Sequence, residues 1–341
     1  MRIALCLHIS LTYGGGGEKW AWSVSRYLKK RGYDVEIRAL PYTPHGRRVV
    51  DPAKVLGDTP YYEAWTHTVH ADVAYIFYNP FAYIFFRCTR NCIRIAGMHS
   101  SVYFLPRTPP KTYGFPAVAA RLLYKVIGLS DLSLYDAVHV VNKAIRVRHP
   151  NVFYVPHFVD TNTYRPLAKK RDKFTVLFVG RPSWQKGGDI FVKVVEMLNK
   201  RGVDIEFLCV GCTTHGPFIQ SAGYIDSDHE LAKVYSSAHI TLYPSRADTF
   251  GLVIIESLAC GTPVITTPIE THVSLELPLL YASSVEGFAE KVLEVKELYE
   301  KRLEDYQRLV DIGRRAVEEL YDVKRVLPKF ENAITSLANK R

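Results

Sequence analysis

Residues 243–264 have the sequence YPSRADTFGLVIIESLACGTPV, and this stretch decides the fold. Residues 240–243 form an apolar run that predicts a strand, and residues 252–259 predict a helix. Gly261 and Pro263 are expected to end that helix, because glycine favours the left-handed conformation after a helix and proline cannot continue one. Residues 264–266 predict another strand. This order of strand, helix and strand favours a parallel sheet covered by helices.

The same alternation extends along the chain in both directions. Further strands are predicted at 3–9, 35–40, 73–77, 92–96, 137–141, 152–155, 174–179 and 205–210, and further helices at 18–31, 190–201 and 229–236. The polar segment 160–172 is typical of a linker, and the chain after residue 285 is helical and charged. We therefore predict an α/β protein with two Rossmann-like doubly wound domains. Ligands of open parallel sheets bind beyond the carboxyl ends of the strands, so we expect the domains to face each other across a cleft.

Length and composition support this organisation. The chain has 341 residues, 48% of them hydrophobic and 23% charged, as in a globular protein of two domains. It has no apolar run of the roughly 18 residues that a spanning helix needs. The short apolar N-terminus leads into four glycines and lacks the pattern of a signal peptide, which predicts a cytoplasmic protein. The cysteine pairs Cys88/Cys92 and Cys209/Cys212 are expected to be buried thiols, with a zinc site as the alternative.

The positive charge is concentrated in the first half of the chain. Residues 1–165 contain 21 Lys and Arg against 10 Asp and Glu, whereas residues 166–341 contain 23 against 24. Such a basic half suits a phosphorylated acceptor, an anionic membrane or a nucleic acid. A solvated surface without a partner is the alternative.

Three motifs carry residues suited to phosphate or sugar binding. Gly14–Gly17 follow the first predicted strand and open the first helix, where backbone N–H groups can approach a phosphate. Arg181 follows the strand at 174–179, and Lys186 precedes the next helix, a pair that suits a diphosphate. The glycine loop at residues 14–17 has neither the dinucleotide fingerprint nor the P-loop pattern. A flexible turn and a solvated pair of cations are the alternatives.

The third motif is the stretch that decides the fold. Asp248 lies at the carboxyl edge of the sheet, and Glu256 lies about two turns further along the helix. Carboxylates in these places can accept hydrogen bonds from sugar and ribose hydroxyls, and backbone N–H groups around Phe250 and Gly251 face the same region. A helix cap for Asp248 and an exposed helix position for Glu256 are the alternatives.

Residues 244–264 resemble the E-x7-E signature of family 4 glycosyltransferases, whose members have the GT-B fold. Asp248 stands at the place of the first glutamate. Other motifs of that family match in chain order: Gly15-Gly16-Gly17-Glu18-Lys19, Gly180-Arg181 with Lys186-Gly187, residues 155–160 (VPHFVD) with Pro166, and Tyr321-Asp322-Val323. The resemblance covers nearly the whole chain.

The resemblance implies a retaining hexosyltransferase that uses a nucleotide diphosphate sugar, with UDP- or GDP-sugars favoured, and needs neither a metal nor another cofactor. The implied catalytic residues are His99, Asp248, Arg181 and Lys186. The implied donor-binding residues are Gly15, Gly16, Gly17, Arg181, Lys186, Thr249, Phe250, Gly251 and Glu256. The implied domains are an acceptor-binding domain at 1–162, a donor-binding domain at 163–320, and a C-terminal helix at 321–341 that crosses back to the first domain.

The chain departs from the family pattern at several positions. These departures bear on the identity of the donor sugar more than on the class of reaction. Asp248 is one methylene shorter than glutamate, and His157-Phe158 replaces the usual Asn-Gly. Residues 269–272 (IETH) replace the usual glycine pair and Pro-Glu step.

The acceptor is expected on the basic first domain. Arg107, Lys111, Arg121 and Lys125 lie among aromatic and aliphatic residues, which suits an anionic membrane surface that carries a lipid-linked or glycan acceptor. A helix packed into its own domain is the alternative. An inactive sugar-nucleotide-binding protein and a nucleic-acid-binding module are the other interpretations of the chain; no nucleic-acid motif supports the second.

Overall fold

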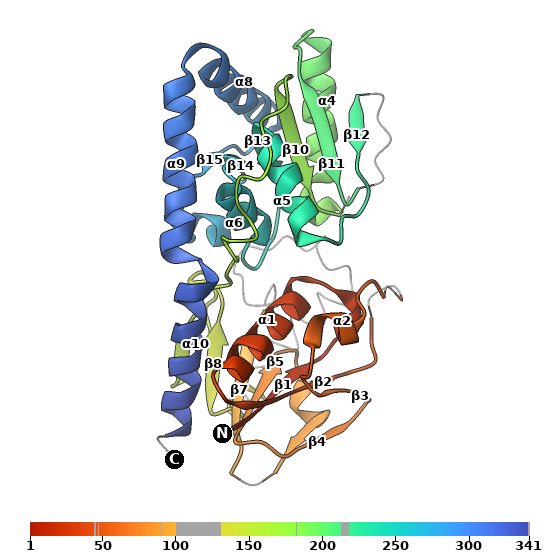
Figure 1. Cartoon of the computed structure of the whole chain (residues 1–341), viewed down its shortest axis with the longest axis vertical. Coiled ribbons are helices and arrows are strands. Elements are labelled where there is room, and N and C mark those ends of the chain that lie inside the picture. The colour runs from red at the N-terminus through yellow and green to blue at the C-terminus, as the bar shows by residue number, and fades with distance from the viewer. Residues whose placement is uncertain are drawn as a thin grey trace. The chain divides into compact units, whose positions relative to one another are not determined.

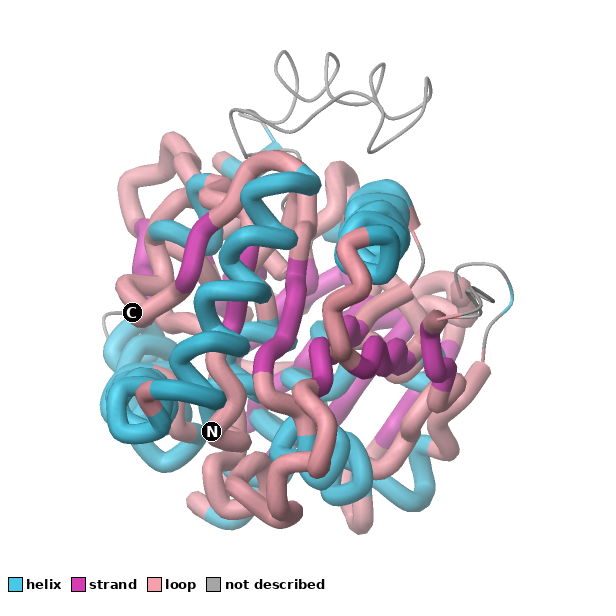
Figure 2. The backbone as a smooth tube through the Cα atoms, turned by 90° about the horizontal axis from the view of Figure 1, so that it is seen from above, coloured by secondary structure: helices cyan, strands magenta, loops and turns pink. Residues whose placement is uncertain are grey.

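The computed structural model (Figure 1) describes residues 1–43, 46, 48–89, 91–99, 131–181, 183–212 and 218–339. Contacts between residues divide the chain into two compact units. The first unit comprises Met1–His157 with Val326–Arg341, and the second comprises Phe158–Arg325. Helices and strands alternate along the chain in both units. Figure 2 shows the helices and strands in different colours along the backbone.

The first unit is built on a parallel sheet of seven strands in the order β3-β2-β1-β5-β7-β8-β9. The strands are β1 (Arg2–Leu7), β2 (Asp34–Ala39), β3 (Tyr61–Glu63), β5 (Val73–Phe77), β7 (Ile93–Met98), β8 (Ala137–Val140) and β9 (Val152–Tyr154). Every residue of β5 and β8 is buried, as expected for central strands that are covered on both faces. A separate parallel pair joins β4 (His67–Val69) to β6 (Phe86–Cys88).

Helix α1 (Gly16–Lys30) packs on this sheet because Trp20, Val24 and Leu28 recur every four residues and are buried. The unit also contains α2 (Pro52–Leu56) and the 3₁₀ turns η1 (Leu11–Tyr13) and η3 (Ala82–Ile84).

Most of helix α10 (Val323–Ala338) belongs to the first unit. Phe330 packs edge-on against Trp20 of α1, with 5.0 Å between the ring centroids. Glu331 accepts hydrogen bonds from Tyr27, Tyr33 and Arg31. The last helix is thus held to α1 by both an aromatic and a charged contact.

The second unit contains a parallel sheet of six strands in the order β12-β11-β10-β13-β14-β15. The strands are β10 (Thr175–Val179), β11 (Glu206–Val210), β12 (Ile219–Ser221), β13 (Ile240–Tyr243), β14 (Val264–Thr266) and β15 (Leu280–Tyr281). Its helical elements are η6 (Trp184–Lys186), α4 (Gly188–Lys200), α5 (Asp228–Ser237), α6 (Leu252–Ala259), α7 (Glu270–Val273), α8 (Val285–Lys301) and α9 (Leu303–Leu320).

Two apolar cores cover the two faces of this sheet. Val176 and Phe178 of β10 belong to one core, together with residues of α4 and α8. Leu177 and Val179 belong to the other core, together with residues of α5 and α6. Alternate residues of one strand enter different cores because successive side chains of a strand point to opposite faces. The doubly wound arrangement predicted from the sequence is therefore present.

Several local predictions are confirmed at residue level. The strands at 73–77, 240–243 and 264–266 and the helix at 252–259 have the predicted bounds. Gly261 adopts a φ of +73° directly after α6, as a left-handed helix cap requires. The short strands β3, β4, β6, β12 and β15 were not expected, because two or three residues are too few to show an alternating pattern.

One cysteine prediction is wrong. Cys209 and Cys212 form a disulfide bridge instead of two free thiols, because β11 and the residues after it bring the two side chains together. Cys92 is buried, as expected, whereas Cys88 is only half-buried, and neither forms a disulfide. Within the described residues, no helix is long and apolar enough to cross a membrane.

Candidate functional site

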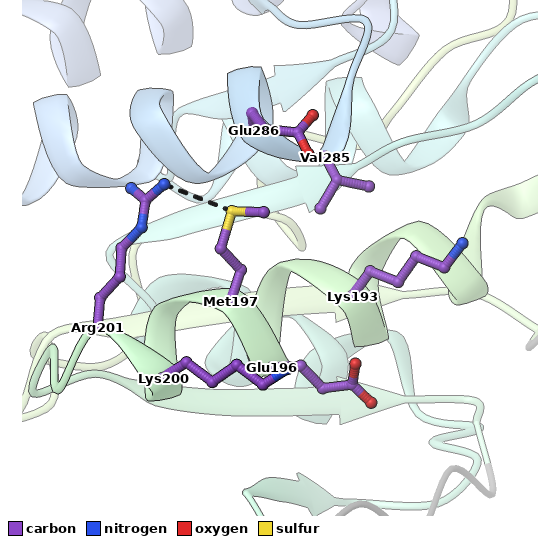
Figure 3. Close-up of a pocket in the computed structure, with 7 residues that line it drawn as sticks. All are labelled: Lys193, Glu196, Met197, Lys200, Arg201, Val285 and Glu286. Atoms are coloured by element: carbon purple, nitrogen blue, oxygen red, sulfur yellow. Dashed lines mark hydrogen bonds between the residues drawn. The ribbon is translucent and has the colours of Figure 1, made fainter.

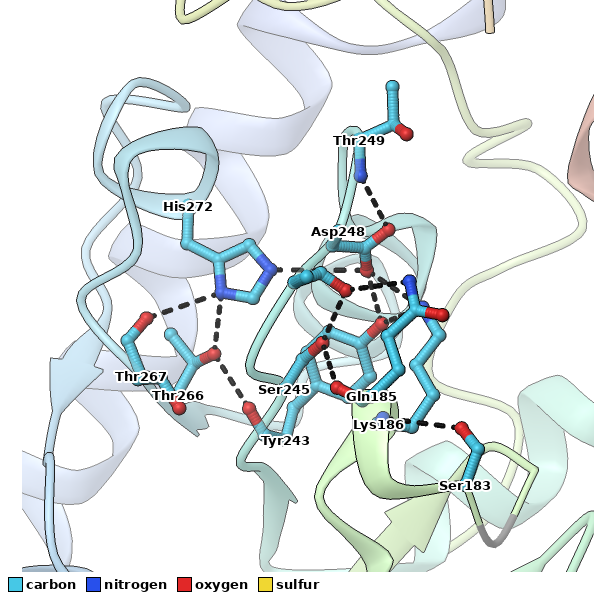
Figure 4. Close-up of polar contacts among 11 residues, drawn as sticks. Ser183, Gln185, Lys186, Tyr243, Ser245, Asp248, Thr249, Thr266, Thr267 and His272 are labelled. Atoms are coloured by element: carbon cyan, nitrogen blue, oxygen red, sulfur yellow. Dashed lines mark hydrogen bonds and ion pairs between the residues drawn. The ribbon is translucent and has the colours of Figure 1, made fainter. Parts of the chain in front are cut away.

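Lys186 and Asp248 meet at the carboxyl edge of the second sheet. β10 and β13 are paired neighbours, and the segments that follow them carry Lys186 and Asp248 respectively. Lys186 Nζ lies 2.9 Å from Asp248 Oδ2 and donates a second hydrogen bond, of 2.7 Å, to Tyr243 Oη (Figure 4). Lys186 and Asp248, two candidate site residues named from the sequence, therefore lie in contact in this unit.

Asp248 is held as an anion by the donors around it. Tyr243 Oη and Lys186 donate to Oδ2, and the backbone N–H of Thr249 donates to Oδ1 at 2.9 Å. Burial alone would raise the pKa of Asp248, but the charge of Lys186 and the hydrogen bond from Tyr243 outweigh it and hold this pKa below its ordinary value. The Thr249 N–H, expected from the resemblance to lie near a sugar, is thus engaged by Asp248.

The two segments that carry this pair are joined along their length. Gln185 accepts hydrogen bonds at its carbonyl oxygen from the Arg246 N–H and the Ser245 hydroxyl, and its side-chain amide donates to the Ala247 carbonyl. Arg246 also forms a bidentate ion pair with Asp189, at 2.6 and 2.7 Å. These contacts fix the position of Lys186 relative to Asp248.

Gly187 permits this close approach. Its φ is +72°, and a Cβ at this position would lie 2.0 Å from the carbonyl oxygen of Pro244. Only glycine fits both the left-handed backbone and the missing space. The two residues of the Lys-Gly motif therefore have different roles. Lys186 supplies a positive charge, and Gly187 allows its segment to pack closely against the segment that contains Pro244.

Glu256 lies on α6, half-buried, and accepts a hydrogen bond of 2.9 Å from Tyr235 Oη of α5. Burial raises the pKa of Tyr235, and the charge of Glu256 raises it further, so the phenol stays protonated and continues to donate. Phe250 is buried and packs edge-on against Tyr321, so its side chain belongs to the core of the second unit. Gly251, with a φ of +100°, begins α6 as its N-cap.

Arg181 is exposed and follows β10 after Gly180. A Cβ on Gly180 would lie 3.8 Å from Lys186 Cβ, so the backbone just before Arg181 is a neighbour of Lys186. This proximity suits the predicted pair of cations.

The glycine loop of the first unit lies between η1 and α1. Gly14 ends η1 with a φ of +67°, Gly15 is the N-cap of α1, and Gly16 and Gly17 form its first turn. Glu18 is buried beside Gly15. Burial raises the pKa of the Glu18 carboxyl to about 7, although hydrogen bonds from the backbone N–H groups of Gly15 and Glu18 act in the opposite direction and lower it. The N–H groups of Gly15 and Glu18 are thus engaged by a carboxyl of the protein.

His99 belongs to a buried chain of hydrogen bonds within the first unit. His139 Nε2 lies 2.7 Å from the Val155 carbonyl, which can only accept, so this nitrogen carries the proton. His139 Nδ1 must therefore accept from Tyr75 Oη at 2.5 Å, which leaves Tyr75 Oη to accept from His99 Nε2 at 2.8 Å. His99 Nδ1 then accepts from His157 Nε2 at 3.4 Å.

One carbonyl oxygen thus fixes the tautomers of three histidines in turn. Burial lowers the pKa of His99 well below its ordinary value and that of His139 to about 4, so both rings are neutral near pH 7. The aromatic rings of Phe77 and Trp20 pack on His99, with centroids at 4.2 and 4.5 Å. Both ring nitrogens of His99 are engaged inside the domain.

The acceptor and membrane residues predicted from the sequence, Arg107, Lys111, Arg121 and Lys125, lie outside the described residues. Within the described part of the chain, no group of three or more His, Cys, Asp and Glu residues could hold a metal ion.

A surface pocket lies between α4 and α8 (Figure 3). It is lined by Lys193, Glu196, Met197, Lys200, Arg201, Val285 and Glu286. None of these residues belongs to the predicted site, and the mixed charges favour no single class of ligand.

Several residues that surround the candidate site residues were not identified from the sequence. Near Asp248 these are Tyr243, His272 and Gln185, which bonds to the segment just before it. Near His99 they are Tyr75 and His139. Tyr243 could have been found, because it ends the strand that leads to Asp248. His272 gave only an indirect signal, since it stands where the resembling family has a different motif. Tyr75 and His139 lie in central strands and give no sequence signal of their own.

Comparison with known proteins matches part of the second unit to a family. Residues 173–297 match the family described as Glycosyl transferases group 1. The chain is 34% identical over 137 residues to D-inositol 3-phosphate glycosyltransferase of Paenarthrobacter aurescens, which is 33% of this chain and 34% of the relative. It is 32% identical over 143 residues to GDP-mannose-dependent alpha-(1-6)-phosphatidylinositol dimannoside mannosyltransferase of Mycobacterium tuberculosis, covering 36% of this chain and 37% of the relative. The chain thus matches about a third of the length of these relatives.

The fold is also that of a solved structure. The crystal structure of Anabaena Alr3699/HepE in complex with UDP and glucose superimposes with a TM-score of 0.72 and 12% identity, covering 98% of this chain and 99% of that chain. This likeness confirms the predicted GT-B fold.

Proposed function

Because residues 173–297 form a glycosyl transferases group 1 domain, we propose that the chain is a retaining glycosyltransferase that moves a hexose-type sugar from a nucleotide diphosphate sugar to an acceptor. The observation that carries the proposal is the Lys186–Asp248 pair at the carboxyl edge of the second sheet. In open parallel sheets this edge is where ligands bind.

In the proposed reaction, the bond between the sugar C1 and the diphosphate oxygen breaks, and a bond from C1 to an acceptor hydroxyl oxygen forms on the same face of the sugar. Arg181 and Lys186 stabilise the negative charge that develops on the leaving diphosphate, an effect typically worth a few kcal/mol per donor group. The acceptor proton passes to the leaving diphosphate, so the scheme uses neither a protein base nor a metal ion.

Asp248 is proposed to hold the transferred sugar and Glu256 the ribose hydroxyls. The hydrogen bonds that hold each carboxylate in place support these roles, because a pre-positioned acceptor loses little freedom on binding. Donor contacts by Gly15, Gly16, Gly17 and His99 remain predictions, since hydrogen bonds inside the domain already engage Gly15 and His99.

The donor is proposed to be a UDP- or GDP-sugar. One similar structure is a complex with UDP and glucose, and one similar relative is named as GDP-mannose-dependent. A thermal-shift panel of UDP-, GDP- and ADP-sugars is the test, because a ligand at 100 times its Kd stabilises a protein by about 2.7 kcal/mol. Absence of any shift across the panel would refute the proposal.

The acceptor is proposed to be anionic, either a glycan or a lipid-linked molecule at the cytoplasmic face of a membrane. The excess of 21 Lys and Arg over 10 Asp and Glu in residues 1–165 supports an anionic partner. Sedimentation with anionic vesicles at low and high salt tests the membrane part. Lack of binding at low salt would exclude it.

An inactive sugar-nucleotide-binding protein is the second candidate, because Asp248 replaces a glutamate of the resembling family. Release of free sugar, or its transfer, from the donor that binds in the thermal-shift panel would exclude this candidate.

A further inference from the structure

His272 is a fully buried histidine that faces the Lys186–Asp248 pair (Figure 4). It lies on α7, beside the turn after β14. Its Nδ1 lies 2.9 Å from Thr266 Oγ1 and 3.3 Å from the Thr267 carbonyl oxygen. Its Nε2 lies 3.9 Å from Asp248 Oδ2.

The neighbours of His272 fix its neutral tautomer. Thr266 Oγ1 donates its own proton to the Tyr243 carbonyl at 2.8 Å, so toward His272 it can only accept. The Thr267 carbonyl also only accepts. The proton of neutral His272 is therefore on Nδ1, and Nε2 presents a lone pair toward the carboxylate.

Nε2 is consequently a buried polar atom without a hydrogen-bond partner among the described residues. Leaving such an atom without a partner is unfavourable. A proton on Nε2 would remove this cost, because the imidazolium would direct an N–H toward Asp248 while Nδ1 kept its bonds to Thr266 and Thr267. The site is therefore built to accept one proton.

The charges at the site decide when that proton is needed. Lys186 is the cation that compensates Asp248, at 2.9 Å. If Lys186 also serves a diphosphate, as the proposed function requires, a nucleotide sugar adds two negative charges beside a lysine that already has an anionic partner. Arg181 offsets one of these charges, which leaves the region one positive charge short.

We propose that binding of a nucleotide sugar at Lys186 is coupled to the uptake of one proton from solvent on Nε2 of His272, which then compensates Asp248 while Lys186 serves the diphosphate. This inference rests on the proposed function, because it requires the diphosphate to bind at Lys186. Linkage makes the coupling reciprocal: donor binding favours the protonated histidine, and a lower pH favours donor binding.

The other groups that face His272 do not take up this proton. Tyr243 of β13 stays neutral, because burial and the charge of Asp248 raise its pKa. Asp248 stays ionised, because its pKa is held low. Glu270 lies on α7 itself and, as a carboxyl group, can supply no positive charge.

Isothermal titration calorimetry near pH 7 tests the coupling, with UDP-glucose or GDP-mannose, whichever shifts the melting temperature. Titrations in phosphate and in Tris buffer give the number of protons taken up, because the two buffers release protons with different enthalpies. The wild type is expected to take up a measurable fraction of a proton, up to one. Its affinity is expected to fall by up to tenfold per pH unit above neutrality.

His272→Asn is the deciding variant, because asparagine keeps a donor near the Nδ1 position and has no atom at Nε2. It is expected to bind more weakly and to show no proton uptake. His239→Asn is the matched control: His239 is another fully buried histidine of the second unit whose Nε2 has no partner among the described residues, but it precedes β13 instead of following it. This control is expected to keep the wild-type uptake.

Equal binding enthalpies of the wild type in both buffers would overturn the inference while leaving the proposed function intact. Wild-type uptake that persists in His272→Asn would overturn the assignment to His272. Failure of every nucleotide sugar to bind would instead overturn the proposed function, and the inference with it.

Discussion

The carboxylate of Asp248 and the ammonium of Lys186 lie 2.9 Å apart, although 62 residues separate them in the chain. They meet because β10 and β13 pair in the sheet and both segments leave its carboxyl edge. The same lysine is proposed to bind the diphosphate, so its loss should weaken ligand binding as well as remove the cation that compensates Asp248.

We predict that Lys186→Ala weakens nucleotide-sugar binding by about 10- to 100-fold, the range expected for a lost charge-assisted hydrogen bond of about 1.5–3 kcal/mol. Calorimetric titration measures this loss. Lys193→Ala on α4 is the matched control, because Lys193 is exposed and outside the predicted site. Equal affinity of Lys186→Ala and the wild type would remove Lys186 from the donor site.

Gly187→Ala is predicted to destabilise the protein by about 2–5 kcal/mol, the sum of a left-handed backbone penalty and an overpacking cost. The new Cβ would lie 2.0 Å from the Pro244 carbonyl oxygen, and backbone must move to make room. Gly202→Ala is the control, since Gly202 has a similar φ of +67° but no atom within 4 Å of a new Cβ. Gly202→Ala should lower the free energy of unfolding only by the penalty for a left-handed backbone, about 1–2 kcal/mol. Urea unfolding compares the two; similar midpoints would show that the two segments are not closely packed.

Acid is predicted to destabilise the first unit between pH 6.5 and 4. The pKa of His139 and that of His8 are lowered by burial to about 4, so below pH 6.5 the unfolded chain binds protons that the folded chain does not. The free energy of unfolding therefore falls as the pH falls, by about 3 kcal/mol for His139 alone.

Urea unfolding at several pH values measures this slope. His139→Gln should flatten it, whereas His229→Gln, at an exposed position, should leave it unchanged. An identical slope in His139→Gln would show that His139 titrates normally in the folded protein.

Tyr75→Phe is predicted to change the tautomer of His99. Without the phenol, His99 Nε2 loses its acceptor and His139 Nδ1 loses its donor. Nitrogen-15 NMR of labelled histidines distinguishes the two neutral tautomers. Phe77→Leu removes a ring that stacks on His99 but no hydrogen bond, and it should keep the wild-type tautomer. Unchanged nitrogen shifts in Tyr75→Phe would refute the hydrogen-bond chain.

The sequence placed Lys186 and Asp248 after strands of the same parallel sheet, and residues that follow parallel strands lie at one edge of it. The contact itself depends on the pairing of β10 with β13, which the strand pattern does not give. Tyr235, which holds Glu256, could not be anticipated. It lies on another helix, and its hydrogen bond depends on how α5 and α6 pack.

The sequence by itself determined most of the longer strands and helices and the parallel character of the sheets. Periodic burial and glycine or proline at element ends are local properties, which is why Gly261 and the bounds of α6 were predicted correctly. Only the tertiary structure decided that His99, Tyr75 and His139 form one chain and that His272 faces Asp248. A hydrogen bond depends on distance and direction in space, and residues far apart in sequence acquire these only when the strands that carry them pack together.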